Sequence, residues 1–307
     1  MDDEDRTASL MTPAKLAQVK PKATVSPAAW LDRMATDAGH THLRRLAELR
    51  ADLQLQATQR DFAALAADLT ALGQSLPQLD FGLLQQNGLI ARLSGKSKSA
   101  GAGFAAQYDE IEAAIDALAA HARTLQASQA DQAGGTEKTL VEFEVEYRAI
   151  DKIIEQGTRW LQDMRTQLKT REAEAADEDA VRQVHEDAQR CELLVVRLKG
   201  LRALSTTAQE THRQAHDAAS HRAALLQALQ GAVAGRMRDW RGRLGTLAAS
   251  AREGETRALS LDVPMECHRE LQLAVKQAAA DCAQVQSHEA ALAGKLQAMG
   301  ERLQAAG

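Results

Sequence analysis

The chain has 307 residues, and its 37 basic and 42 acidic side chains leave a formal net charge of −5 at pH 7. Both signs are spread along the sequence, so there is no overall positive field for nucleic acid or for an anionic membrane. Only four Phe, three Trp and two Tyr are present, and residues that favour helices dominate. The composition predicts an all-α protein: an elongated bundle of long antiparallel coiled-coil-like helices, without a nucleic-acid partner.

The cysteines indicate a reducing compartment. Cys191, Cys267 and Cys282 are too few and too scattered for a disulfide framework, and their number is odd. The acidic N-terminus lacks an apolar run, and no stretch approaches the roughly 20 apolar residues that cross a bilayer. We therefore expect a cytoplasmic protein with neither a secretory signal nor a membrane-spanning segment.

The first third of the chain divides into three predicted parts. Residues 1–25 are polar and aperiodic, which predicts a disordered tail. Ser26-Pro27 has the pattern of a helix start, and residues 26–93 are expected to form short helices. Residues 94–103 are rich in Gly, Ser and Lys and predict a flexible linker.

Residues 104–307 are predicted to form the long-helix bundle. Apolar residues alternate steps of three and four from Phe104 to Leu125 and again from Leu140 to Leu168, which is typical of helix packing seams. Because Gly134-Gly135 interrupts these runs, we expect two helices that fold back on each other. Further helical stretches are expected from about Asp179 and over Leu271 to Leu303.

Between the apolar runs of the third stretch lies a polar, Ala-rich section. It contains Thr206, Thr207, His212 and His216, and its weak apolar seam makes these residues a candidate docking surface. His212 and His216 also have the i, i+4 spacing that places two imidazoles on one helical face. No HExxH pattern accompanies them, so we interpret them as exposed polar histidines and expect no metal.

A second candidate contact surface precedes and enters the linker. Three basic residues lie beside three aliphatic ones, a combination that can rest on an anionic lipid surface or a partner. Three charges allow at most a weak peripheral membrane contact, and a solvated linker is the simpler interpretation. The residues are Leu89, Ile90, Arg92, Leu93, Lys96 and Lys98.

The sequence carries no pattern typical of an enzyme. We find no nucleophile elbow, dinucleotide fingerprint or complete phosphate loop. The paired acidic groups lie on the polar faces of the expected helices, where carboxylates keep ordinary chemistry. We therefore expect no catalytic residues, no cofactor and no small-molecule substrate.

Two segments resemble a known family. Ala91-Arg-Leu-Ser-Gly-Lys96, followed by Phe104-Ala-Ala-Gln-Tyr108 and the Ile115-Asp116 pair, is similar to the apolar-basic segment and aromatic-led helix of the TelA family of toxic-anion (tellurite) resistance proteins. Downstream, the Leu/Arg-rich stretch from Arg197 to Leu204 and the later Trp240 agree in order and spacing. Ser94 stands where the family has Phe, so the chain resembles a divergent member.

The resemblance implies a bacterial, cytoplasmic, non-enzymatic helical protein linked to tellurite resistance and cell-envelope stress. We expect a scaffold that assembles with itself or with other stress-resistance proteins. Two alternatives stay open. One is a metal- or oxyanion-binding protein acting through His212, His216 and a cysteine thiolate, and the other is a purely architectural coiled coil, such as a phage or secretion-system component.

Overall fold

The computed structural model describes residues 37–60, 62–85, 96–254 and 260–306, and the side chains of residues 96–98 lie outside this description. Every regular element in these ranges is a helix, which confirms the all-α prediction. The predicted tail, residues 1–25, and the helix start at Ser26 lie outside the described residues. The elements are α3 (His40–Thr58), α4 (Ala63–Ser75), η2 (Leu76–Gln78), α5 (Gly82–Gln85), α7 (Lys96–Glu174), α8 (Glu178–Ala228), η3 (Leu229–Val233), α9 (Ala234–Glu253) and α10 (Asp262–Ala306).

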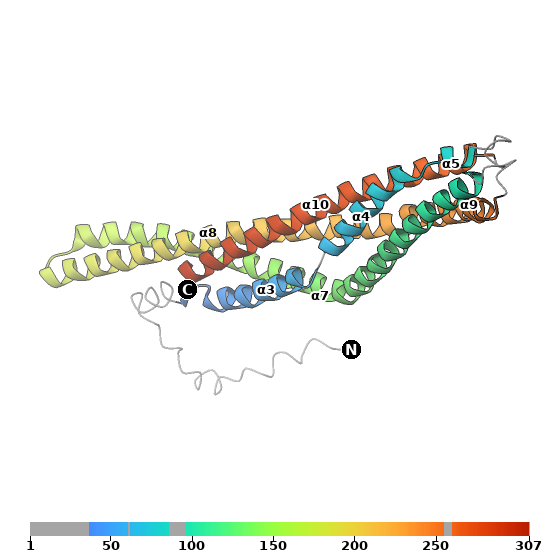
Figure 1. Cartoon of the computed structure of the whole chain (residues 1–307). Coiled ribbons are helices and arrows are strands. Elements are labelled where there is room, and N and C mark those ends of the chain that lie inside the picture. Colours follow the sequence, from blue (N-terminus) through green and yellow to red (C-terminus); the bar gives the residue numbers. More distant parts are fainter. Residues whose placement is uncertain (1–36, 61, 86–95, 255–259, 307) are drawn as a thin grey trace, which may run out of the picture. The chain divides into compact units, whose positions relative to one another are not determined.

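The chain divides into two compact units, whose helices are labelled in Figure 1. Of the described residues, the first unit holds those from 37 to 40 and from 152 to 201, and the second holds those from 41 to 151 and from 202 to 306. Each unit therefore takes part of α7 and part of α8.

In the first unit, α7 and α8 run antiparallel and are joined by a short turn after Glu174. As the residue numbers increase along α7, those of the contacting residues on α8 decrease. Gly157 contacts Leu198, Arg165 pairs with Glu192, and Arg171 pairs with Asp187. Gly157 permits this approach, because an added Cβ would lie 2.9 Å from a methyl group of Leu198. In this unit α7 and α8 therefore meet through the close contact of Gly157 with Leu198 and through ion pairs nearer the turn.

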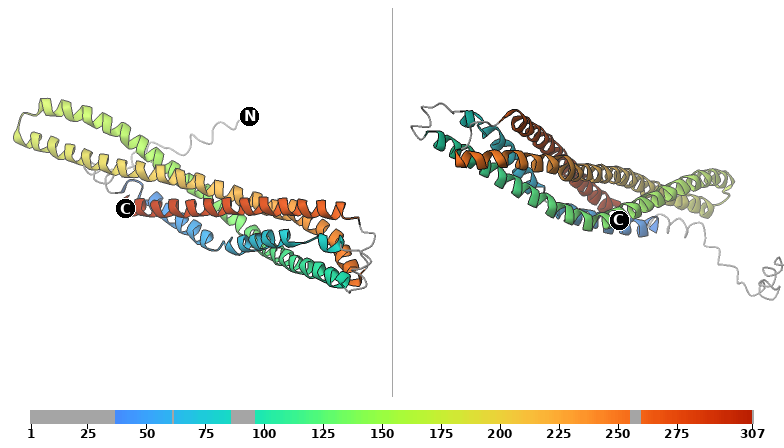
Figure 2. Two further views of the ribbon diagram at one scale, coloured as in Figure 1. Left: turned by 45° about the horizontal axis from the view of Figure 1, so that its top comes forward. Right: turned by 90° about the vertical axis from the view of Figure 1, so that its right-hand side faces the viewer.

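The second unit holds the main core. Helix α3 buries an aliphatic stripe whose members are spaced by three and four residues: Leu43, Leu46, Leu49 and Leu53. Helix α4 lies along α10, as both views in Figure 2 show, and its Leu65, Leu69 and Leu72 are at most 1% exposed. The core also takes the inward faces of α7, α9 and α10, including Phe104, Ile111, Ile115, Trp240, Leu244, Leu271 and Val275.

Helix α9 lies against the N-terminal half of α7. An added Cβ on Gly101 would meet the backbone oxygen of Ala251 at 2.3 Å, so only glycine allows the two backbones to approach this closely. Arg241 on α9 pairs with Asp116 on α7. This close packing brings aromatic side chains of both helices into contact.

The π-helical turn η3 keeps the buried face in phase between α8 and α9. The buried residues Leu225, Leu229, Val233 and Met237 are separated by three successive steps of four. In an α-helix each such step overshoots one full turn by about 40°, which would carry the face away from the core. The wider π turn absorbs this excess, so all four side chains stay buried.

Two predictions about helix ends are wrong. Gly134-Gly135 does not break the chain, because α7 runs without interruption from Lys96 to Glu174, and the predicted pair of folded-back helices within it is one helix. Residues 96–103 of the predicted linker are also helical. Glycine lowers helix propensity by only about 1 kcal/mol per residue, and side-chain contacts on either side outweigh that cost.

None of the helices that the structure describes combines the length and the apolar character that crossing a bilayer requires.

Candidate functional site

A layer of polar side chains crosses the interior of the second unit at the level of Gly134-Gly135. We call it the polar layer and define it as Arg60, Gln129, Gln132, Thr136, Arg222 and Glu289. Gln129, Gln132 and Thr136 lie on α7, Arg222 lies on α8 and Glu289 on α10. Arg60 follows the end of α3. The layer thus joins three helices and the segment after a fourth.

Two guanidinium groups share one carboxylate in this layer. The side chains of Arg60 and Arg222 are 3% and 4% exposed, and that of Glu289 is 16% exposed. Arg222 donates to Glu289 Oε1, whereas Nη1 of Arg60 lies 3.7 Å from Glu289 Oε2. Two cations and one anion leave one positive charge without a neutralising carboxylate among the described partners. Burial, and then the nearby charge of Arg222, lower the pKa of Arg60 to about 10.

Hydrogen bonding in the polar layer is incomplete. Nη2 of Arg60 reaches Thr136 Oγ1 at 3.4 Å and Gln56 Oε1 at 3.5 Å, both long contacts. Four buried atoms of the layer have no hydrogen-bond partner among the described residues: Arg60 Nε, Gln129 Nε2, Gln132 Oε1 and Glu289 Oε2. Unpartnered buried polar atoms are costly, so such a concentration marks a place where a further polar group would be stabilised.

A cleft of about 440 Å³ opens beside the polar layer, between α7 and α8. Gln129, Thr136 and Arg222 line it on the side of the layer. Small and apolar residues line the remainder, among them Ala130, Ala133, Ala219, Ala223, Leu140 and Leu226. Because alanines face each other across the two helices here, their side chains are too short to fill the space. Gln126, Glu137 and His216, all exposed residues, complete the lining.

Sequence reasoning missed this site because it followed apolar residues only. The steps of three and four continue from Leu125 through Gln129, Gln132 and Thr136, so the buried face of α7 is unbroken although it becomes polar. On α8 the same spacing from Ala218 reaches Arg222 before Leu225. Arg222, a charged residue at a position where the spacing predicts a buried apolar one, was the signal in the sequence that could have revealed this site.

The predicted docking residues of α8 lie on different sides of the helix. Thr206 and His216 are exposed, whereas Thr207 and His212 are half-buried. His212 lies with its ring centroid 4.6 Å from that of His216 and 5.6 Å from that of Tyr147. Burial, together with the charge of His216, lowers the pKa of His212. Of these four residues, only Thr206 and His216 are therefore exposed to a partner, and the Thr206 hydroxyl already donates to the backbone oxygen of Arg202 at 3.1 Å.

Metal and thiolate chemistry find little support in the geometry. The two histidines share a helical face, but no group of three or more His, Cys, Asp or Glu side chains within the described ranges is arranged to hold a metal ion. Cys191, Cys267 and Cys282 are free and buried. Burial raises the pKa of each thiol, which disfavours the thiolate that a nucleophile or ligand needs.

The predicted basic contact surface cannot be placed. Leu89, Ile90, Arg92 and Leu93 lie outside the described residues. Lys96 and Lys98 belong to the first turn of α7, and their side chains are also outside the description.

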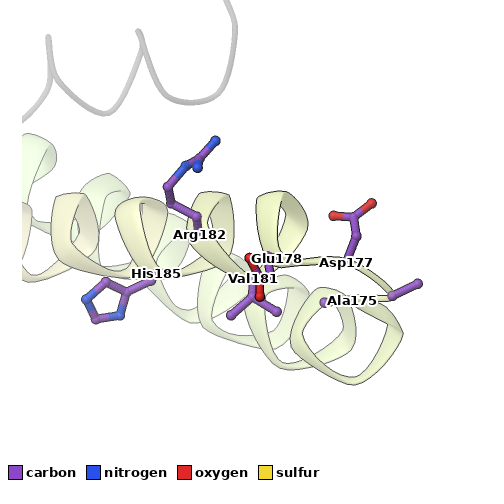
Figure 3. A pocket seen from close by; sticks show the side chains of 7 residues that line it. Ala175, Asp177, Glu178, Val181, Arg182 and His185 are labelled. Carbon is purple, nitrogen blue, oxygen red and sulfur yellow. The ribbon is translucent and has the colours of Figure 1, made fainter.

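A second hollow, of about 640 Å³, lies in the first unit at the turn between α7 and α8 (Figure 3). The figure shows the guanidinium of Arg182 and the ring of His185 on opposite sides of the α8 ribbon. Arg182 pairs with Asp179 at 2.6 Å, where both side chains are well exposed. The charged side chains around this hollow point away from one another and are exposed to water. The cleft beside the polar layer is therefore the better candidate site.

Comparisons with protein-family models, with curated proteins and with solved structures found no match to this chain.

Proposed function

We propose that the protein is a non-enzymatic helical scaffold of the bacterial cytoplasm that acts through protein–protein interaction in resistance to toxic anions such as tellurite and in the response to cell-envelope stress. The resemblance of Ala91 to Lys96, Phe104 to Tyr108 and Arg197 to Leu204 to the TelA family supports the biological setting.

The observation that carries the scaffold role is a pair of aliphatic side chains exposed on α8. Leu193 and Val196 are 61% and 67% exposed, and their spacing of three places them on the same helical face. Neighbouring exposed aliphatic residues that are framed by charged side chains are typical of a surface that a partner covers. We infer that a partner helix or a second copy contacts this part of the first unit.

The test combines a gene deletion with matched complementation. The deletion strain should lose tolerance to tellurite and to envelope-active antibiotics, and the unaltered gene should restore it. The double substitution Leu193→Glu/Val196→Glu should fail to restore tolerance, because two carboxylates oppose burial at an interface. Unchanged tolerance in the deletion strain would contradict the proposed role.

The control adds the same charge elsewhere. Gln167→Glu/Gln183→Glu also introduces two carboxylates at exposed positions of the first unit, and it should restore tolerance fully. Light scattering on both purified variants separates lost assembly from lost folding, provided that circular dichroism shows equal helix content.

The architectural alternative predicts a different result. A coiled-coil component of a larger particle should form filaments or rings visible by electron microscopy, and its deletion should leave stress tolerance unchanged. The alternative through His212, His216 and a thiolate has less support, because burial raises the pKa of all three thiols and so disfavours the thiolate. The lowered pKa of His212 also disfavours the imidazolium that would attract an oxyanion.

A further inference from the structure

We propose that the cleft beside the polar layer binds a small organic carboxylate, with its head group on Arg222 and Gln129 and its apolar body between α7 and α8. This inference does not depend on the scaffold function, because it rests on the interior of the second unit alone.

The positive charge of the site favours an anionic ligand. Arg60 and Arg222 are almost fully buried, and among the described residues only Glu289 pairs with them. Within the described part of the chain, two buried cations therefore share one carboxylate. A buried charge without a counterion is strongly disfavoured. A monoanion entering from the cleft would neutralise it.

The donors of the site select a carboxylate head. Nη1 of Arg222 donates a hydrogen bond to Glu289. A planar guanidinium has further N–H groups, and it can bind a carboxylate through two hydrogen bonds. Gln129 lines the same cleft, and its Nε2 is a buried donor that finds no partner in the part of the chain that the structure describes. Thr136 Oγ1, which donates to Gln56 Oε1 at 2.7 Å, closes the polar side.

The remaining walls of the cleft favour a ligand whose part beyond the carboxylate is apolar. Ala133, Ala219, Ala223, Leu140 and Leu226 line the cleft away from the arginine, and they offer nothing to a hydrated inorganic ion. The volume of about 440 Å³ lies within the range of small-molecule sites. Exposed Glu137 lies among the lining residues and disfavours a second negative charge, so a monocarboxylate fits better than a dicarboxylate.

The test is isothermal titration calorimetry of the full chain with octanoate, octanamide and sulfate. Octanoate should bind, and octanamide, which has the same body without the charge, should bind at least tenfold more weakly. Sulfate should bind more weakly than octanoate. Equal binding of octanoate and octanamide would reduce the site to an apolar cleft, and binding of sulfate alone would reduce it to an inorganic anion site; either result overturns the proposal.

Substitutions then place the ligand. Arg222→Gln should weaken octanoate binding at least tenfold, whereas Arg213→Gln, which removes an exposed arginine of the same helix, should leave it unchanged. Because Arg222→Gln disturbs the pair with Glu289, a second variant fills the cleft instead: Ala219→Phe keeps every charge and should abolish binding. Full octanoate binding by the folded Ala219→Phe protein would overturn the proposal.

Discussion

The indole ring of Trp240 lies parallel to the ring of Tyr108, with centroids 4.9 Å apart and planes inclined by 4°. Trp240 is fully buried, and its Nε1 donates to Nδ1 of buried His268 at 3.0 Å. One side chain of α9 thereby contacts both α7 and α10. Trp240 therefore packs α9 against two other helices of the second unit.

Replacing this residue should therefore be costly. Trp240→Ala should lower the free energy of unfolding by about 3–5 kcal/mol, because it leaves a cavity and removes a buried hydrogen bond. Tyr108→Phe, which keeps the ring but loses the bond of 3.0 Å from the hydroxyl to Glu112, should cost about 1 kcal/mol. Urea denaturation followed by circular dichroism measures both, and equal losses would show that stacking contributes little.

The two adjacent glycines of α7 offer a direct test of helix continuity. An added Cβ at Gly134 or Gly135 would meet no atom within 4 Å. Alanine at each position should therefore stabilise the protein by up to about 1 kcal/mol through helix propensity. If the chain instead turned there, alanine would destabilise it. The melting temperature of Gly134→Ala/Gly135→Ala distinguishes the two structures.

Gly101 should respond in the opposite way. Gly101→Ala places a Cβ 2.3 Å from the Ala251 carbonyl oxygen, and the forced separation of α7 from α9 should cost about 1–3 kcal/mol. Gly103→Ala is the matched control, since its Cβ would lie 3.6 Å from a methyl group of Leu83, an ordinary contact. The control should be neutral or stabilising in the same denaturation experiment, and a similar loss in both would refute this account of the contact.

Buried His268 should make stability depend on pH. Burial lowers its pKa below the ordinary value of 6.5, so the unfolded chain binds this proton more readily than the folded protein does. The stability that neutral His268 confers is complete above pH 6.5, and it is lost progressively as the pH falls from 6.5 toward the folded-state pKa. His268→Asn keeps an acceptor for Trp240 but does not titrate, and it should flatten the fall in melting temperature. Half-buried His212, whose pKa is also lowered, contributes equally to both proteins, so an unchanged slope would exclude His268 as a source.

Much of the helical architecture could be predicted from the spacing of apolar residues. The apolar residues of the runs from Phe104 and from Leu140 are buried as expected. The error at Gly134-Gly135 has a definite cause: the local preference of glycine was weighed without the contacts that hold this part of α7. Thr136, one residue beyond, bonds to Gln56, which no pattern within α7 could reveal.

The candidate site was harder to predict from the sequence than the helices were. His212 and His216 attracted attention because their spacing is a known ligand pattern, yet they yield no metal-binding group among the described residues. Arg60, Arg222 and Glu289 have no pattern in common along the chain. They meet because three separate parts of the chain fold to the same level of the bundle.

The sequence by itself determined that the chain is helical and which apolar faces of its helices turn inward, because the periodicity of apolar side chains decides which of them lie on one face and can be buried together. Only the tertiary structure decided where α7 continues, which polar residues share the interior and where a cleft remains. The physical reason is that the cost of burying a charge, or of leaving space unfilled, is set by neighbours that are remote in the chain.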